Sequence, residues 1–132
     1  MTVVVDASCV VAGLVDDGGA GRWAESQLAG DDLAAPHLMP VEVANVLRRA
    51  VLAGDLTRDV GSLAHGDLLA LPVALFAYEP LAERVWELRR GLTAYDAWYV
   101  ALAEVLAAPL ATVDIRLSRS KGPRCAFLTP SD

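Results

Sequence analysis

The sequence predicts an α/β protein in which helices cover a central parallel sheet on both sides. Its opening residues, Thr2-Val3-Val4-Val5, make a poor helix and a good strand, because β-branched side chains pack well on a pleated sheet. The run is apolar on both faces, as in a central strand buried between helices. Short apolar segments then alternate with segments of helical pattern, which is the order of βαβ units with right-handed crossovers.

The expected elements follow one another along the chain. We expect strands at residues 2–5, 33–35, 73–76 and 110–113, with a possible fifth at 126–128. We expect helices at residues 9–14, 20–28, 41–52, 57–71, 81–90 and 94–107. The strand at 33–35 is weakly marked because it is rich in alanine, which favours helices. Gly30-Asp31-Asp32 is expected to end the helix before this strand.

Single residues mark several of the helix ends. Pro40 suits the first turn of a helix, where its missing N–H costs nothing. Thr57 and Thr93 can each cap the helix that follows. Gly54 and Gly91 stand where the helical pattern stops, and they end two of the predicted helices.

Length and composition predict one globular domain spanning residues 1–132, with 55% hydrophobic residues to form its core. Charged residues, Pro or Gly interrupt every apolar run well before the roughly 18–20 residues of a membrane span. The first valines meet Asp6 too early for a signal peptide, so we expect a cytoplasmic protein. Cys9 and Cys125 lack CxxC spacing and are expected to be small apolar residues rather than a disulfide.

Four acidic residues stand where predicted strands end or the next helices begin. Asp6 and Asp114 follow the first and fourth strands, and each can cap the segment after it. Glu42 and Asp96 lie in the first turns of helices, where the helix dipole favours an acid. Asp96 also stands three residues after Thr93, close to a capping-box arrangement. Each acid therefore has an ordinary structural explanation.

Taken together, the four acids predict a metal site. Strand ends and the first turns of the following helices share one side of a parallel α/β sheet, where ligands bind. Carboxylates crowded there repel one another unless a cation neutralises them, and ligands that are all oxygen suit Mg²⁺ or Mn²⁺. We expect Ser8, Asn45 and Thr112 to orient these carboxylates as hydrogen-bonding neighbours.

The segments around the acids resemble the successive motifs of PIN-domain ribonucleases. They are VVVDAS at residues 3–8, PVEVANVL at 40–47, TAYDAWYVALAE at 93–104 and ATVD at 111–114. The third segment is the most specific of the four. Within the family, the chain is similar to the VapC toxins of bacterial toxin–antitoxin pairs, and the resemblance extends over essentially the whole chain.

The resemblance implies a three-layer α/β/α PIN-like fold and an endoribonuclease that depends on Mg²⁺ or Mn²⁺. It assigns catalysis and metal binding to Asp6, Glu42, Asp96 and Asp114. It also implies a cognate VapB-like antitoxin whose tail covers the active site, and a homodimer. We expect a metal-activated water as the nucleophile. The sequence offers no convincing histidine base, since His37 and His65 are expected to be ordinary surface or packing residues.

A basic segment follows Asp114 directly. Arg116, Arg119 and Lys121 are candidates for contacts to an RNA backbone, although the segment can equally be a solvated loop. The net charge of −6 by itself argues against non-specific nucleic-acid binding, but the charges are unevenly placed. We expect four aromatic residues to be core or interface anchors: Trp86, Tyr95, Trp98 and Tyr99.

Other protein classes fit the sequence less well. A haloacid-dehalogenase-like phosphatase would have a second Asp two residues after Asp6, where this chain has Ser8. A response-regulator-like receiver would have adjacent acids at its first strand and a Lys after its last, whereas Lys121 precedes the final strand. A non-toxin PIN nuclease in RNA processing and a non-catalytic signalling or interaction domain with an acidic pocket stay open as alternatives.

Overall fold

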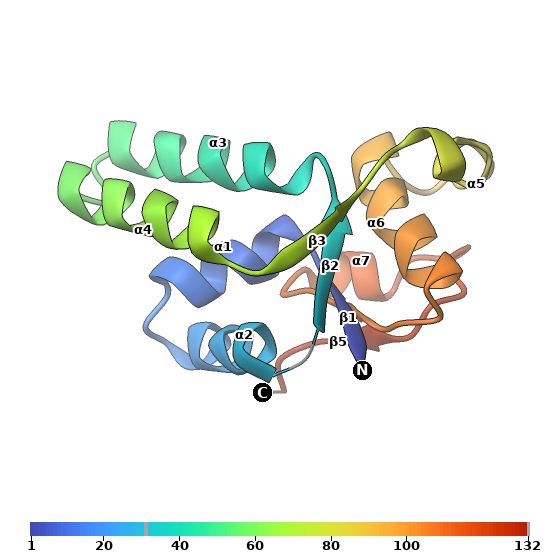
Figure 1. The fold of residues 1–132 in the computed structure, drawn as a ribbon, viewed down its shortest axis with the longest axis horizontal. Coiled ribbons are helices and arrows are strands. Elements are labelled where there is room, and N and C mark those ends of the chain that lie inside the picture. The colour runs from blue at the N-terminus through green and yellow to red at the C-terminus, as the bar shows by residue number, and fades with distance from the viewer. Residues whose placement is uncertain (31, 132) are drawn as a thin grey trace.

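A parallel five-stranded sheet lies at the centre of the protein, with strand order β3-β2-β1-β4-β5 (Figure 1). A computed structural model describes residues 1–30 and 32–131. The strands are β1 (Thr2–Val5), β2 (Asp32–Pro36), β3 (Val73–Phe76), β4 (Leu110–Ala111) and β5 (Phe127–Leu128). Asp31, part of the segment expected to end the second helix, lies outside the described residues. The expected α/β/α architecture and parallel sheet are confirmed.

Helices cover the sheet in two groups (Figure 1). The first group is α1 (Ala7–Val15), α2 (Gly19–Gly30), α3 (Met39–Leu52) and α4 (Arg58–Ala70). The second is the 3₁₀ turn η1 (Glu79–Leu81) with α5 (Ala82–Glu87), α6 (Ala94–Val105) and the short α7 (Ile115–Ser118). Among the described residues, no helix combines the length and hydrophobicity needed to cross a membrane.

Several boundaries differ from the prediction for local reasons. The helix expected at 81–90 ends at Glu87, and the chain continues in tight turns in which the Gly91 N–H donates to Leu88 O. The helix expected to reach residue 107 stops at Val105, and Ala107 adopts a left-handed φ of 50°. Thr57 and Thr93 cap their helices as predicted, each accepting a hydrogen bond from the N–H three residues on.

The strand expected at 110–113 is also shorter, because β4 ends at Ala111. Beyond it, the Thr112 N–H still donates to Leu128 O, but the Val113 N–H donates to the Ser8 hydroxyl. Where the chain leaves the sheet, the Ser8 side chain therefore accepts the backbone hydrogen bond that a carbonyl of the neighbouring strand would otherwise accept. This exchange brings Ser8 against the end of β4.

The core is formed by the valines of β1 and the facing residues of α1, α3 and α6. Val4, Val5 and Val10 are completely buried, and so is Val43 on α3. Cys9 is buried as well, and both cysteines are free thiols. Burial raises the pKa of Cys9 to about 12, so its thiol stays neutral, as expected of a small apolar residue.

The strand order places a change of direction beside β1. From β1 the chain steps to β2 and β3 on one side, and then returns to β4 and β5 on the other. Ligands of open α/β sheets bind at such a switch point, outside the carboxyl ends of the strands. Asp6 follows β1 directly, and Asp114 lies three residues beyond the last residue of β4. The fold therefore brings these two acids to the same edge of the sheet.

Candidate active site

Two of the four acids act as helix caps at the ends of neighbouring strands. Asp6 is the N-cap of α1, and its Oδ1 accepts the Cys9 N–H at 2.9 Å. Asp114 is the N-cap of α7, and its Oδ1 accepts the Leu117 N–H at 3.2 Å. The capping roles that the sequence allowed are thus real. These capping hydrogen bonds also hold the Asp6 and Asp114 carboxylates in place.

Asp6 is the most deeply buried of the four acids, with 6% of its surface exposed. Burial raises the pKa of the Asp6 carboxyl, and the negative charge of Asp96 raises it further. Hydrogen bonds from Thr112, Ser8 and the Cys9 backbone oppose this effect. Ser8 contributes through a short bond of 2.7 Å from its Oγ to Asp6 Oδ1. The carboxylate is therefore held rigidly, and hydrogen bonds rather than a Lys or Arg of the described structure stabilise its charge.

Glu42 lies in the first turn of α3 and contacts a residue of α6. The buried Tyr99 hydroxyl donates to Glu42 Oε1 at 2.6 Å. Burial raises the pKa of Glu42, the hydrogen bond from Tyr99 opposes the shift, and the charge of Asp96 adds to it. Burial and the Glu42 carboxylate together raise the pKa of Tyr99, so the hydroxyl keeps its proton.

Asp96 connects the four charges. Its negative charge raises the pKa of both Asp6 and Glu42. Burial raises the pKa of Asp96 itself, the charge of Asp114 raises it further, and the Arg116 guanidinium lowers it. Asp96 therefore lies within electrostatic range of Asp6, Glu42 and Asp114. A single metal site formed by all four acids stays a prediction.

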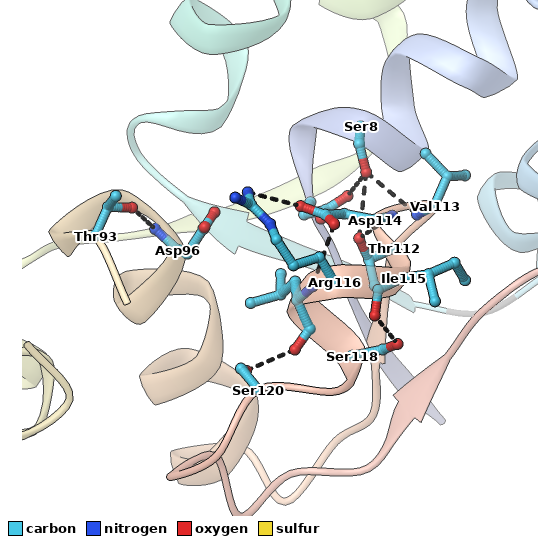
Figure 2. A network of polar contacts seen from close by, with 12 residues as sticks. Ser8, Thr93, Asp96, Thr112, Val113, Asp114, Ile115, Arg116, Ser118 and Ser120 are labelled. Atoms are coloured by element: carbon cyan, nitrogen blue, oxygen red, sulfur yellow. Dashed lines mark hydrogen bonds and ion pairs between the residues drawn. The ribbon is translucent and has the colours of Figure 1, made fainter. Parts of the chain in front are cut away.

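Two hydroxyls bridge the ends of β1 and β4. Ser8 Oγ lies 3.2 Å from Thr112 Oγ1, and Thr112 Oγ1 accepts the Asp114 N–H at 2.9 Å. Figure 2 shows this chain of contacts from Ser8 through Thr112 to Asp114. Ser8 thus bonds the Asp6 carboxylate directly, and Thr112 holds the backbone of Asp114.

Asn45 does not take the place expected for it. It is exposed and makes no hydrogen bond to any of the four acids in the described part of the chain. Three residues after Glu42 on α3, it is turned toward solvent. The neighbour of Glu42 is instead Tyr99, which comes from a different helix 57 residues away in sequence.

Arg116 reaches over the acids from the start of the basic segment. Its Nη2 lies 3.7 Å from Asp114 Oδ2, and Figure 2 shows the guanidinium between the side chains of Asp96 and Asp114. The side chain is 88% exposed, so this is a loose, solvated ion pair. A cleft of about 140 Å³ opens beside it, lined by Gly91, Leu92, Thr93, Asp96, Arg116, Leu117 and Ser120.

The rest of the basic segment is anchored by a partly buried glutamate that the sequence did not single out. Arg84 on α5 donates to both oxygens of Glu104 on α6, at 2.7 and 3.1 Å. Glu104 also accepts the Arg124 N–H at 2.7 Å, while Arg84 donates to Gly122 O at 3.0 Å. Burial alone would raise the pKa of Glu104, but these hydrogen bonds outweigh it and lower the pKa.

Arg119 and Lys121, the two other candidates for RNA contacts, are both exposed.

The aromatic residues expected to be core or interface anchors divide into two groups. Tyr99 is a core residue, as expected, and Trp98 is partly buried and packs against the core. Trp86 is 66% exposed and Tyr95 is 60% exposed, because each lies on the solvent side of its helix. A place in the core is therefore excluded for these two.

The chemistry of the four acids fits a divalent ion bound through oxygen. All four donors are carboxylates. Burial raises the pKa of three of them, and the charge of a neighbouring acid adds to each shift, a cost that a cation would relieve. Within residues 1–30 and 32–131, no three His, Cys, Asp or Glu side chains already converge on a common point. Mg²⁺ needs no such cage, because it commonly keeps several waters and takes only one or two carboxylates directly.

The parallel sheet, its switch point and the four nearby acids are typical of an α/β protein that binds a ligand or metal at the carboxyl ends of its strands. Comparison with known families shows which family this is. The family model described as PIN domain matches residues 3–122. The chain therefore belongs to the PIN-domain family.

Comparison with individual proteins narrows the similarity to VapC ribonucleases. Ribonuclease VapC9 of Mycobacterium tuberculosis (strain ATCC 25618 / H37Rv) is 41% identical over 123 residues, which cover 93% of this chain and 94% of that protein. The crystal structure of PAE2754 from Pyrobaculum aerophilum has a TM-score of 0.72 and 26% identity, covering 96% of this chain and 83% of that one.

A second solved structure has the same fold. The crystal structure of VapBC2 from Rickettsia felis, bound to a DNA fragment from their promoter, matches with a TM-score of 0.68. The match covers 99% of this chain and 100% of that one, at 12% identity. At this identity the likeness establishes the fold alone.

Proposed function

We propose that this chain is a VapC-type endoribonuclease that hydrolyses RNA phosphodiesters with the help of Mg²⁺ or Mn²⁺. The observation that carries the proposal is the coupling of four carboxylates at one sheet edge, with Asp96 as their common neighbour. The similarity to ribonucleases named VapC supports the reaction class. Both histidines, His37 and His65, are exposed, and neither is among the groups that shift the pKa of Asp6, Glu42 or Asp96.

Asp6, Glu42, Asp96 and Asp114 would hold the ion, with Ser8 and Thr112 orienting Asp6 and Asp114. When bound, a divalent ion activates water for attack and stabilises charge on the phosphoryl and leaving oxygens. Arg116, Arg119 and Lys121 would bind the RNA backbone beside the acids. Because backbone contacts carry no sequence information, these residues supply affinity and register rather than choice of sequence.

A second part of the proposal concerns partners. We propose that a VapB-like antitoxin neutralises the enzyme, that the enzyme is a homodimer, and that it acts in the cytoplasm. Support for the antitoxin comes from similarity to VapC proteins and from the fold shared with VapBC2. Four coupled acids offer a place where a basic segment of such a partner would be attracted.

Replacing single acids tests the enzymatic proposal. Asp6→Asn and Asp96→Asn should abolish cleavage of total RNA in Mg²⁺ while leaving the circular dichroism spectrum unchanged. Asp67→Asn, which removes an exposed acid from α4, is the matched control and should cleave at the wild-type rate. Full activity in both site variants would exclude this mechanism. Absence of any Mn²⁺ binding by the wild type in isothermal titration would instead favour a non-catalytic domain.

A further inference from the structure

The Tyr99 hydroxyl links three of the elements that carry the acids. Tyr99 lies on α6, three residues after Asp96, and its hydroxyl donates to Glu42 Oε1 on α3 at 2.6 Å. The backbone N–H of Ala7, the first residue of α1, faces the same hydroxyl oxygen, and the charge of Asp6 is close enough to raise the pKa of Tyr99. The Tyr99 hydroxyl therefore bonds Glu42 and lies close to Asp6, and Tyr99 is on the same helix as Asp96.

The geometry of the bond restricts how Glu42 can point. A short O–H···O contact to a carboxylate is among the stronger hydrogen bonds in proteins. It engages Oε1 and leaves Oε2 without a hydrogen bond in the described structure. Tyr99 itself is rigid, because its ring is 2% exposed within the core between α6 and the sheet. A flexible glutamate at the rim is therefore attached to a fixed donor.

We propose that Tyr99 is a positioning residue that holds the Glu42 carboxylate in the orientation needed to bind the divalent ion. The proposal rests on the proposed metal-dependent function. It gives a role in that function to Tyr99, which is not itself one of the proposed metal ligands. Tyr99 acts only through Glu42: its hydroxyl fixes one oxygen so that the other faces the remaining acids. A buried tyrosine also needs a hydrogen-bond acceptor for stability alone, so the test must separate orientation from packing.

Tyr99→Phe removes the donor and keeps the ring. We expect Mn²⁺ affinity, measured by isothermal titration, to fall by about 10-fold or more, as for other residues that orient metal ligands. The Mg²⁺ concentration for half-maximal RNA cleavage should rise in parallel, while KM for RNA at saturating Mg²⁺ stays unchanged. Tyr78→Phe is the matched control, since the Tyr78 ring packs edge-on against Trp98 and its hydroxyl has no hydrogen bond in the described structure.

Three further variants extend the test, and the first two complete a double-mutant cycle. In a Glu42→Gln background, Tyr99→Phe should cause little additional loss of Mn²⁺ affinity, because the carboxylate on which Tyr99 acts is gone. Glu42→Asp keeps the charge but withdraws it from the hydroxyl, and it should weaken Mn²⁺ binding without any change at Tyr99. Urea titration shows whether Tyr99→Phe is folded. If it is not, Glu42→Asp still tests the proposal, because Mn²⁺ binding as tight as that of the wild type would contradict it.

The outcomes distinguish this proposal from the proposed function. If the wild type binds no Mn²⁺ and cleaves no RNA, the enzymatic proposal fails. If the wild type does both and Tyr99→Phe binds Mn²⁺ as tightly as Tyr78→Phe, the role of Tyr99 is overturned and the enzymatic proposal stands. Equal losses of Mn²⁺ affinity from Tyr99→Phe in the wild-type and Glu42→Gln backgrounds would likewise overturn it.

Discussion

The Ser8 and Thr112 hydroxyls lie 3.2 Å apart, although 104 residues separate them along the chain. Ser8 holds Asp6 from one side of this contact, and Thr112 holds the backbone of Asp114 from the other. The Val113 N–H adds a third bond, which it donates to the Ser8 hydroxyl at 3.2 Å. The ends of β1 and β4 are thereby joined into one polar unit beneath the carboxylates.

Ser8→Ala should weaken this unit and the protein together. The substitution removes the bond to Asp6 and leaves the Val113 N–H without its acceptor, so we expect a loss of about 1–3 kcal/mol in the free energy of unfolding. Cleavage activity should also fall, since Asp6 loses a neighbour that orients it. Urea denaturation and an RNA cleavage assay measure the two effects. Ser26→Ala is the control, because its exposed hydroxyl bonds only within its own helix; equal stability losses in both variants would refute a special role for Ser8.

Asp96→Asn should stabilise the metal-free protein. Asp96 is the common neighbour of the other acids, so removing its charge relieves repulsion with Asp6, Glu42 and Asp114. We expect a gain of up to about 1 kcal/mol, small because solvent screens partly exposed charges. Mn²⁺ should raise the melting temperature of the wild type but not of this variant, because a ligand stabilises only the state that binds it. Thermal melts with EDTA or Mn²⁺ test both statements, and a lower melting temperature for the variant in EDTA would contradict the first.

The metal-free protein should become more stable as the pH is lowered from about 7 to about 5. The folded state raises the pKa of Asp6, Glu42 and Asp96 above the values in the unfolded chain. A raised carboxyl pKa gives stability that is fully present below the unfolded pKa and is lost as pH rises through the folded pKa. Glu104 has a lowered pKa, so its contribution begins to fall only below its ordinary value of 4.5, outside this range.

Urea titrations in EDTA across this pH range measure the effect. Asp96→Asn should flatten the dependence, because it removes one titrating group and the charge that raises the pKa of two others. Asp67→Asn should leave the dependence as it is in the wild type. A free energy of unfolding that falls steadily as the pH is lowered through this range would show that the folded state does not raise the pKa of these acids.

Arg116→Ala combined with Arg119→Ala should weaken RNA binding and reduce its salt dependence. Each lost contact to a single-stranded phosphate backbone lowers the slope of log K against log salt by about 0.7. Fluorescence anisotropy with an RNA oligonucleotide in a salt series measures the slope. Arg48→Ala with Arg49→Ala removes the same charge from the exposed side of α3 and serves as the control. An unchanged slope in the first pair would exclude the basic segment as an RNA contact.

Sequence patterns predicted most strands, helices and caps, although several element ends were predicted two or three residues too late. β1 was readable because three consecutive valines suit only a buried strand, and Thr93 because a cap acts on the N–H three residues on. Asp6 and Asp114 were found for the same reason, since each stands at a local strand-to-helix junction. Asn45 shows the limit of such reasoning: helical spacing placed it near Glu42, but spacing alone does not reveal which side of α3 faces solvent.

By itself, the sequence determined the order of strands and helices along the chain, the sheet edge that Asp6 and Asp114 reach, and the family to which the chain belongs. The tertiary structure decided which side chains meet there: Tyr99 with Glu42, Ser8 with Thr112, and Arg84 with Glu104. These pairs come from elements far apart in the chain, so their contacts depend on how helices pack across the sheet. Periodicity and capping depend on neighbouring residues, whereas a hydrogen bond between α3 and α6 exists only once both helices are docked on the same core.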